Sequence, residues 1–333
     1  MKFLVIGLGS MGKRRIRNLQ YLKKNDILGW DLRANRRKEC EDKYKIKSYE
    51  NIDEALTKKP DAIIISTPPD HHLEYQLLAT KNKIHFFCEA GISTDGFVDL
   101  IPMVEKQKII AAPSATLRFN DSIKKIKELI KKEKIGNIVA FTYHMGQYLP
   151  DWHPWENISK FYVGKRKTSA TREMVPFELE WLTWIFGDIN KISCMKGKIS
   201  NLKVDIDDVY QLIFQFKSGI IGHLLVDVIS RSPTRIIRIV GEKGTVYWDW
   251  MEDIVRLFDS NKEKWFEFEE KKGFKENGYV AKENMYIDEI NNFINAINGK
   301  EKYIYSLEED FKILKLLEAV EESAEKEVHI NLK

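Results

Sequence analysis

Three glycines near the N-terminus carry the chemistry that the sequence predicts most directly. Gly7, Gly9 and Gly12 form a G-x-G-x-x-G pattern immediately after the apolar run of residues 2–6. In a strand–turn–helix unit, the first glycine allows a tight turn, the second lets the backbone approach a pyrophosphate, and the third lets the helix pack on the strand. The N–H groups that begin such a helix also attract phosphate. The predicted cofactor-binding residues of this turn are Gly7, Gly9, Ser10, Met11 and Gly12.

An acidic residue stands where the second strand of such a unit would end. Asp31 follows Gly12 by 19 residues, a spacing that suits a contact with the ribose 2′-hydroxyl of NAD. Arg33, with Arg36 and Arg37 behind it, would instead suit the 2′-phosphate of NADP, unless these arginines are only the solvated start of a helix. We therefore predict that the cofactor is NAD or NADP, with NAD favoured. A glycine-rich turn in an unrelated α/β protein is the alternative.

A second group of reactive side chains lies between residues 147 and 180. The segment lacks clear periodicity, which predicts a loop leading into a helix, and functional residues gather on such loops. His153 is the best general acid/base, because the ordinary pKa of histidine lies near the working pH. Trp152 and Trp155 could stack on a sugar ring, while the alternative is an arm that contacts a second subunit. Two further residues would suit an anionic substrate group, namely Lys167 and Arg172.

The order of the predicted elements places these residues in an α/β protein. Short apolar strands alternate with helices up to about residue 117, which predicts a doubly wound parallel sheet of the Rossmann type covered on both faces. Longer strands in consecutive hairpins follow, then two closing helices, which predict an α+β domain with a mostly antiparallel sheet. We expect a nucleotide-binding domain at residues 1–118 and a substrate-binding and oligomerisation domain at residues 119–333.

Composition narrows the class of protein. The 333 residues suffice for two domains, and 31% are charged with a net charge of only +4, which argues against a nucleic-acid partner. No apolar run approaches the roughly 20 residues of a membrane span, so no membrane partner is expected. Cys40, Cys88 and Cys194 lie far apart, which favours buried free thiols and the reducing cytoplasm. No spacing of histidines, cysteines and carboxylates indicates a metal site.

The order of several motifs resembles the glucose–fructose oxidoreductase/inositol dehydrogenase (Gfo/Idh/MocA) family over essentially the whole chain. The motifs are GLGSMG at 7–12, IISTPPDHH at 64–72, FCEAG at 87–91, LRFNDSIKKIKELI at 117–130, KIGNIVA at 134–140, FGDI at 186–189 and GEKGTVYWDW at 241–250. The resemblance implies a Rossmann domain, a second domain with a large open sheet, and a homodimer or homotetramer formed through that sheet. It places six residues at the cofactor: Ser66, Thr67, Pro68 and His72 along the nicotinamide, Glu89 after the next strand, and Arg118 near the domain junction. For His72, helix capping or surface exposure is the alternative.

Two positions depart from the family pattern. The usual Glu-Lys-Pro, whose lysine is the typical catalytic residue, is here Glu89-Ala90-Gly91. The family's Asp and His, four residues apart on a helix, correspond to Glu173 and Phe177. A hydroxyl proton must still be transferred if an alcohol is oxidised. Glu173, which holds the acid position, and Lys160 are therefore candidates beside His153.

The resemblance implies an NAD(P)-dependent oxidoreductase that acts on a sugar-like small molecule, such as a sugar nucleotide, amino sugar or sugar acid. The segments around Ala90 and His153 resemble family members of bacterial surface-glycan synthesis. The alternative from another class is a non-catalytic NAD-binding sensor or structural protein that has lost the lysine. A nucleotide-sugar lyase or epimerase with tightly held NAD is a third reading.

Overall fold

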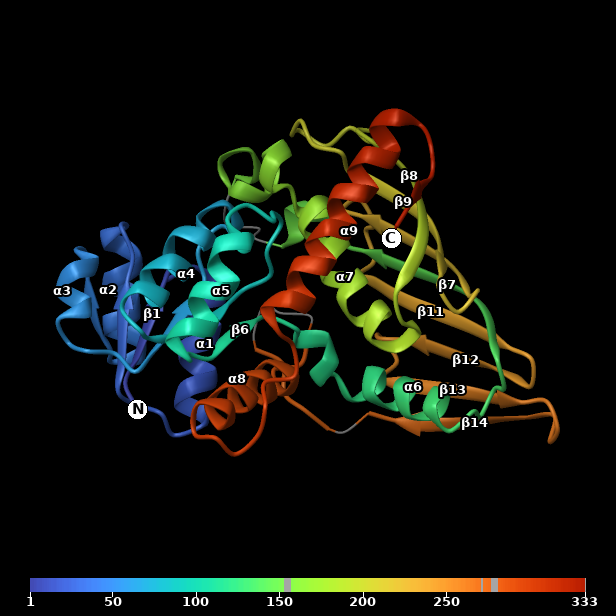
Figure 1. Cartoon of the computed structure of the whole chain (residues 1–333), viewed down its shortest axis with the longest axis horizontal. Helices are drawn as coiled ribbons and strands as arrows, with labels where there is room; N and C mark the ends of the chain where they lie inside the picture. The colour runs from blue at the N-terminus through green and yellow to red at the C-terminus, as the bar shows by residue number, and fades with distance from the viewer. Residues whose placement is uncertain (153–156, 271, 277–280, 333) are drawn as a thin grey trace. The chain divides into compact units, whose positions relative to one another are not determined.

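The computed structural model of the chain describes residues 1–152, 157–270, 272–276 and 281–332. The chain divides into two compact units, of which unit 1 comprises residues 1–119 and 273–312, and unit 2 comprises residues 120–272 and 313–333 (Figure 1). The sequence analysis had assigned residues 273–312 to the second domain, whereas here they cluster with unit 1. The reason is that the helix in this segment packs on a helix near the N-terminus, a contact between distant parts of the chain.

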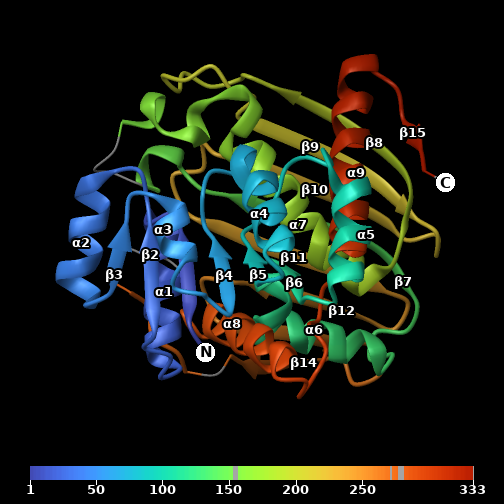
Figure 2. The ribbon, with the colours of Figure 1, turned by 60° about the vertical axis from the view of Figure 1, so that its left-hand side comes forward.

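Unit 1 is built on a six-stranded sheet in the order β3-β2-β1-β4-β5-β6 (Figure 2). Every neighbouring pair is parallel, which confirms the predicted Rossmann sheet. Strands β1, β2 and β4 are buried along their whole length, as expected for apolar runs covered on both faces. The strands are β1 (Phe3–Ile6), β2 (Ile27–Trp30), β3 (Lys47–Tyr49), β4 (Ala62–Ile65), β5 (His85–Cys88) and β6 (Ala111–Pro113).

Helices cover both faces of this sheet. One apolar core joins β1 and β4 to α1, α2 and α8, while α4 contacts β4, β5 and α5. The helices are α1 (Ser10–Tyr21), α2 (Ala34–Tyr44), α3 (Ile52–Leu56), α4 (His72–Lys81), α5 (Phe97–Gln107) and α8 (Asn284–Ile297), and α9 (Leu307–Lys326) begins in this unit. The strand β3 was not predicted, because three residues are too few to show a periodicity.

Unit 2 contains a nine-stranded sheet in the order β14-β13-β12-β11-β7-β10-β9-β8-β15. All neighbours are antiparallel except β7 and β10, which confirms the predicted mostly antiparallel sheet. The strands are β7 (Ile138–Gly146), β8 (Ile189–Gly197), β9 (Val209–Phe216), β10 (Ile221–Asp227), β11 (Thr234–Gly241), β12 (Gly244–Asp249), β13 (Ile254–Asp259), β14 (Lys264–Glu269) and β15 (Ile330–Asn331). The strand β8 was missed by the sequence analysis.

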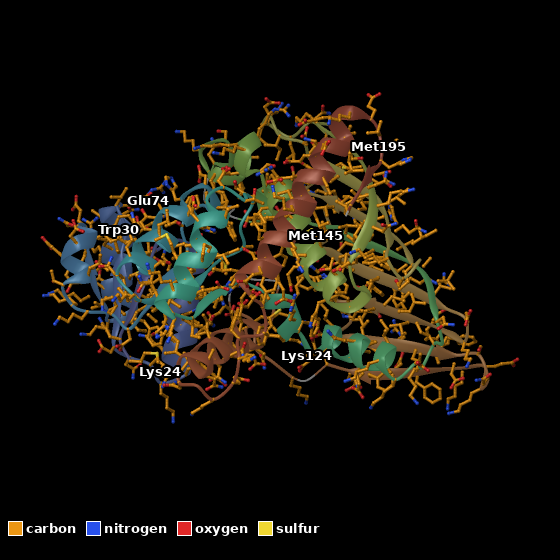
Figure 3. The ribbon with its side chains drawn as sticks, in the orientation of Figure 1. Lys24, Trp30, Glu74, Lys124, Met145 and Met195 are labelled. Atoms are coloured by element: carbon orange, nitrogen blue, oxygen red, sulfur yellow. The ribbon has the colours of Figure 1, made fainter. Side chains whose placement is uncertain are left out.

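The two faces of this sheet differ in what they carry. Helices α6 (Asp121–Lys131) and α7 (Ala170–Phe186) contact one face, onto which Met145 of β7 points and is buried. On the opposite face Met195 of β8 is 81% exposed, and Ile213 and Ile221 are also exposed there (Figure 3). Paired strands place these three side chains on the same face. An exposed apolar sheet face of this kind is typical of an interaction surface.

Helix α7 corrects one expectation about its start. A proline inside a helical pattern, here Pro176, predicts a kink or a late start of the helix, but α7 already begins at Ala170. The side chain of Ser169 accepts the N–H of Arg172 and so caps the helix before the proline is reached. The three cysteines are buried and free, as predicted. Among the described residues, no helix has the length and apolar character to cross a lipid bilayer.

Candidate functional site

The glycine turn between β1 and α1 has the geometry of a nucleotide cradle. Gly7 has φ +90, and a Cβ there would lie 2.6 Å from the carbonyl oxygen of Ser66. A Cβ on Gly12 would lie 1.8 Å from the carbonyl oxygen of Gly7, so only glycine lets α1 approach the strand. At Gly9 the nearest neighbour of a Cβ would be the side chain of Arg36 at 3.4 Å. Backbone atoms therefore do not crowd the position of a Cβ at Gly9.

Asp31 directly follows β2 and reaches back to this turn. Its Oδ2 accepts the N–H of Leu8 at 2.8 Å, and its Oδ1 accepts the N–H of Arg33 at 2.8 Å. The side chain of Arg33 is exposed, whereas Nη1 of Arg36 lies 3.7 Å from Oδ2 of Asp31. Arg37 donates to the backbone oxygen of Asp31 and to another acid, Glu50. The guanidinium of Arg36 thus lies beside both the carboxylate of Asp31 and the glycine turn.

The ends of β4 and β5 supply a second group of polar atoms in unit 1. His72 is buried, and its Nε2 lies 3.0 Å from the backbone oxygen of Thr67, so this nitrogen carries the proton. Burial lowers the pKa of His72, so the ring is neutral. Among the described residues, Nδ1 of His72 and Oγ1 of Thr67 are buried without a hydrogen-bond partner. Such orphaned atoms at the edge of a ligand site are available to a ligand.

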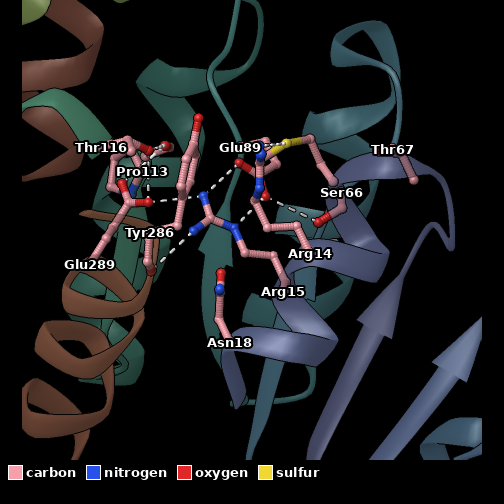
Figure 4. Close-up of polar contacts among 12 residues, drawn as sticks. Arg14, Arg15, Asn18, Ser66, Thr67, Glu89, Pro113, Thr116, Tyr286 and Glu289 are labelled. Carbon is pink, nitrogen blue, oxygen red and sulfur yellow. Dashed lines mark hydrogen bonds and ion pairs between the residues drawn. The ribbon is translucent and has the colours of Figure 1, made fainter. Parts of the chain in front are cut away.

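Glu89, the glutamate of the altered motif, is held by a buried arginine that the sequence analysis missed (Figure 4). Arg15 of α1 donates from Nε to Oε1 of Glu89 at 2.7 Å and from Nη2 to Oε2 at 2.8 Å. Nη2 also lies 2.9 Å from Oε2 of Glu289 on α8. The hydroxyl of Ser66 donates to Glu89 at 3.2 Å, which ties the ends of β4 and β5 together.

Arg118, the sixth residue that the resemblance places at the cofactor, is buried at the end of unit 1's first segment. Its Nη1 donates to the backbone oxygen of Ile304 at 3.0 Å and to Glu309 at 3.3 Å. Its guanidinium also lies 4.6 Å from the ring centre of Tyr305. These contacts anchor the chain between α8 and α9.

The predicted catalytic and substrate residues all belong to unit 2, and the structure gives them different surroundings. His153 and Trp155 lie outside the described residues. Lys160 and Lys167 are exposed in short 3-10 turns, and Glu173 lies in the first turn of α7. The segment before α7 thus consists of 3-10 turns, in line with the predicted loop.

Two of the predicted substrate residues have contacts within unit 2. Trp152 packs against the apolar cluster that contains Leu149, although its Nε1 is buried without a partner among the described residues. Arg172 donates through Nε and Nη2 to Glu321 of α9, at 2.5 and 2.9 Å, and through Nη1 to the backbone oxygen of Lys167. The packing of Trp152 and the pairing of Arg172 with Glu321 both hold the loop in place. Each of these two side chains therefore has a structural role within unit 2 besides any contact with a ligand.

Phe177 is the residue that the resemblance places at the family's histidine. The residue after it, Glu178, is fully buried and accepts the hydroxyl of Tyr143 at 2.7 Å and the indole N–H of Trp181 at 2.9 Å. Arg235 donates to the same carboxylate at 2.7 Å, and its guanidinium lies 5.9 Å from the ring centre of Phe177. Burial and the neighbouring Glu178 raise the pKa of Tyr143 well above its usual value. This network supports α7 and offers no replacement for the histidine.

Comparison with known proteins shows that both parts of the chain match models of one family. Residues 1–112 match the family described as "Oxidoreductase family, NAD-binding Rossmann fold", and residues 123–247 match the "GFO/IDH/MocA C-terminal domain". Myo-inositol 2-dehydrogenase of Thermotoga maritima is 30% identical over 145 residues, which are 41% of this chain and 42% of the relative. The 2,7-anhydro-N-acetylneuraminate hydratase of Escherichia coli is 24% identical over 206 residues, 59% of this chain and 53% of the relative. The matches thus span about half the length of these curated relatives.

A solved structure extends the likeness to the whole fold. An oxidoreductase from Agrobacterium radiobacter, in complex with NAD+, L-tartaric acid and magnesium, has a TM-score of 0.88 against this chain at 16% identity. The superposition covers 99% of this chain and 98% of that one. At this level of identity the likeness concerns the fold.

Proposed function

We propose that this chain, which belongs to the Gfo/Idh/MocA family of oxidoreductases, binds NAD at the glycine turn and is an enzyme that oxidises or reduces a sugar-like substrate. The observation that carries the proposal is the hydrogen bond of 2.8 Å between the N–H of Leu8 in the turn and Oδ2 of Asp31. It holds the predicted ribose acid against the predicted pyrophosphate cradle. When bound, the nicotinamide supplies the hydride acceptor or donor.

The described residues of unit 1 fit this cofactor. The N–H groups at the start of α1 would hold the pyrophosphate, because Gly9 leaves room for its approach. Among the described residues, no side chain accepts a hydrogen bond from these N–H groups as a helix cap. Oγ1 of Thr67 and Nδ1 of His72 would serve the carboxamide of the nicotinamide, because both lack a partner. Asp31 favours NAD, and Arg36 is the arginine best placed to meet a 2′-phosphate. The remaining proposed contacts are Gly7, Ser10, Met11, Gly12, Arg33, Ser66, Pro68, Glu89 and Arg118.

A group other than the usual lysine must move the proton of the substrate hydroxyl, because Ala90 has no titratable side chain. We assign this role first to His153, whose ordinary pKa suits it, then to Glu173 and Lys160. Lys167 is exposed and would attract an anionic substrate group. Arg172 would contribute only after exchanging its bonds with Glu321. Trp152 and Trp155 are the proposed stacking side chains.

The named relatives guide the choice of substrates. One relative is called a myo-inositol 2-dehydrogenase and another acts, by its name, on an anhydro sugar acid. We propose a polyhydroxylated substrate of this kind, such as a sugar nucleotide, amino sugar or sugar acid. The exposed sheet face around Met195, Ile213 and Ile221 is the surface through which we propose that copies of the chain form a dimer or tetramer.

The test is a spectroscopic screen at about 340 nm, where NADH absorbs, with NAD and then NADH against panels of these substrate classes. Turnover that falls at least tenfold in His153→Ala or Glu173→Gln, with unchanged NADH affinity, supports the assignments. Turnover that persists in both variants contradicts them.

A non-catalytic NAD-binding protein is the second candidate, favoured by the absence of the lysine at Ala90 and of the histidine at Phe177. It predicts tight NADH binding with no absorbance change for any substrate class. The hydratase relative makes a third outcome worth measuring, namely conversion of a sugar substrate without net change in NADH.

A further inference from the structure

Five charged side chains are buried together in unit 1, and their charges do not balance. Arg14 pairs with Glu283 at 3.0 Å, and Arg15 is shared between Glu89 and Glu289 (Figure 4). The exposed fractions of the side chains are 5% and 1% for the first pair, 0% for Arg15 and Glu289, and 13% for Glu89. Two positive groups thus face three carboxylates, which leaves one surplus negative charge.

The titratable side chains of His72 and Cys88, which lie near Glu89, do not offset this surplus. Burial lowers the pKa of His72 and raises that of Cys88, so both are neutral at pH 7. Asp310 accepts the hydroxyl of Tyr305 at 3.1 Å, and burial raises the pKa of Asp310 to about 7. Arg118 is also buried in unit 1, but it forms an ion pair with another carboxylate, that of Glu309. A buried uncompensated charge is costly, so the surplus must attract a proton or a cationic ligand.

The triad can hold a proton without losing its contacts. Glu289 accepts the N–H of Ala115 at 2.7 Å, and its other neighbours include the hydroxyls of Ser114 at 3.0 Å and Thr116 at 2.8 Å. A hydroxyl can donate to a carboxylate or accept from a carboxylic acid, so either protonation state of Glu289 is satisfied. Burial raises the pKa of Glu289, although Arg15 opposes the effect. The proton belongs to Glu289, which is the fully buried carboxylate of the triad.

The triad lies under the edge where the nicotinamide half of the cofactor would lie. Ser66 follows β4 and donates to Glu89, which follows β5. In the sheet β1 has β2 on one side and β4 and β5 on the other. A dinucleotide anchored after β1, with its adenosine ribose on Asp31 after β2, therefore extends its other half over β4 and β5. The nicotinamide ring is positive in NAD+ and neutral in NADH, so only the oxidised form brings a compensating charge.

Given the NAD site of the proposed function, on which this inference rests, we propose that the Arg15–Glu89–Glu289 triad distinguishes the oxidised from the reduced cofactor by exchanging a proton. In the free protein Glu289 holds a proton. Binding of NAD+ sends that proton to solvent, because the positive ring takes over the compensation, whereas binding of NADH leaves it in place. The triad is a selectivity and positioning device, and it replaces no catalytic residue.

Proton release can be measured without knowing the substrate. Isothermal titration of the full-length protein with NAD+ and with NADH at about pH 7, in phosphate and in Tris, gives the number of protons released with each form. We expect a substantial fraction of a proton for NAD+ and close to none for NADH. The Kd of NAD+ should fall as pH rises from about 5.5 to about 8.5, by about tenfold for each unit by which the ring lowers the pKa of Glu289. The Kd of NADH should stay level over the same range.

Glu289→Gln removes the surplus carboxylate while keeping an oxygen for the N–H of Ala115. We expect it to abolish the proton release and to make the ratio of the two Kd values independent of pH. Glu105→Gln, the same change at an exposed position of α5, should behave as wild type. Equal proton release with NAD+ and NADH in the wild-type protein overturns the inference, and this result needs no variant to fold. Failure of both forms to bind would instead overturn the proposed function.

Discussion

Alanine at Gly9 and alanine at Gly12 should separate cofactor binding from folding, although the two positions lie in one turn. At Gly12 the new Cβ would meet two backbone atoms, the oxygen of Gly7 at 1.8 Å and its carbonyl carbon at 2.9 Å. At Gly9 it would meet only the end of the Arg36 side chain, which begins at 3.4 Å. Gly9 has φ −74 and ψ −160, an extended conformation that any residue adopts.

The expected stabilities follow from these contacts. The clash at Gly12 cannot be relieved by a rotamer, so we expect Gly12→Ala to cost at least about 2 kcal/mol, even after the roughly 1 kcal/mol by which alanine is favoured in helices. For Gly9→Ala, the lower entropy of the unfolded chain stabilises by about 0.4–1 kcal/mol, and the poorer helix cap offsets it. The Tm of Gly9→Ala should therefore lie within about 2 °C of wild type.

Cofactor binding should be sensitive to the change at Gly9, although that change leaves the stability almost unaltered. The Cβ of Gly9→Ala would stand where the pyrophosphate approaches the start of α1 and would remove a charge-assisted hydrogen bond, worth about 1.5–3 kcal/mol. The Kd for NADH should rise by about 10- to 150-fold. Fluorescence titration of NADH and thermal melting of the same samples measure both quantities. The reasoning fails if Gly9→Ala binds NADH like wild type, or if Gly12→Ala melts like wild type.

Three further changes test the surroundings of the site. Asp31→Ala should weaken NAD binding by at least about tenfold in a titration, since it removes the proposed ribose contact. Unchanged NAD affinity of this variant would refute the ribose assignment. Arg36→Gln should weaken the binding of NADP only. Glu178→Gln removes the buried carboxylate that pairs with Arg235 and should cost about 3–5 kcal/mol in urea unfolding, and a loss below about 1 kcal/mol would contradict it. Asp310 has a folded-state pKa raised from 3.8 to about 7, so the unfolded chain loses this proton first as pH rises and stability falls between about pH 4 and 7. Asp310→Asn should lack this fall, so its Tm should gain on wild type across that interval; parallel Tm curves would rule the effect out.

The cofactor half of the site was predictable because its signals are local. The turn Gly7–Gly12 and Asp31 sit at the ends of neighbouring strands, and a parallel sheet brings such ends to one edge. Arg15 was missed, although an arginine one turn before Leu19 on a buried helix face is unusual. Its partners Glu89 and Glu289 lie far along the chain, and no periodicity announces a contact of that separation.

The substrate half was less predictable, for a different physical reason. Residue types in the loop before α7 showed which groups could react, but not which of them other parts of the unit already hold. Arg172 is bound by Glu321 of α9, and Trp152 packs on an apolar cluster. Pro176 also misled, because a proline suggests a late helix start, while the cap at Ser169 sets the start independently.

The contacts of Glu89 explain why a glutamate stands here without the lysine that follows it in the family pattern. Arg15 is fully buried and donates two hydrogen bonds to Glu89 and one ion pair to Glu289. Without Glu89, the arginine would keep one carboxylate but lose two charge-assisted bonds, and Ser66 would lose its acceptor. The glutamate is therefore needed by the packing of α1 against β4 and β5, whatever residue follows it. Ala90 takes no part in these contacts, so they do not depend on the lysine that the resemblance places at this position.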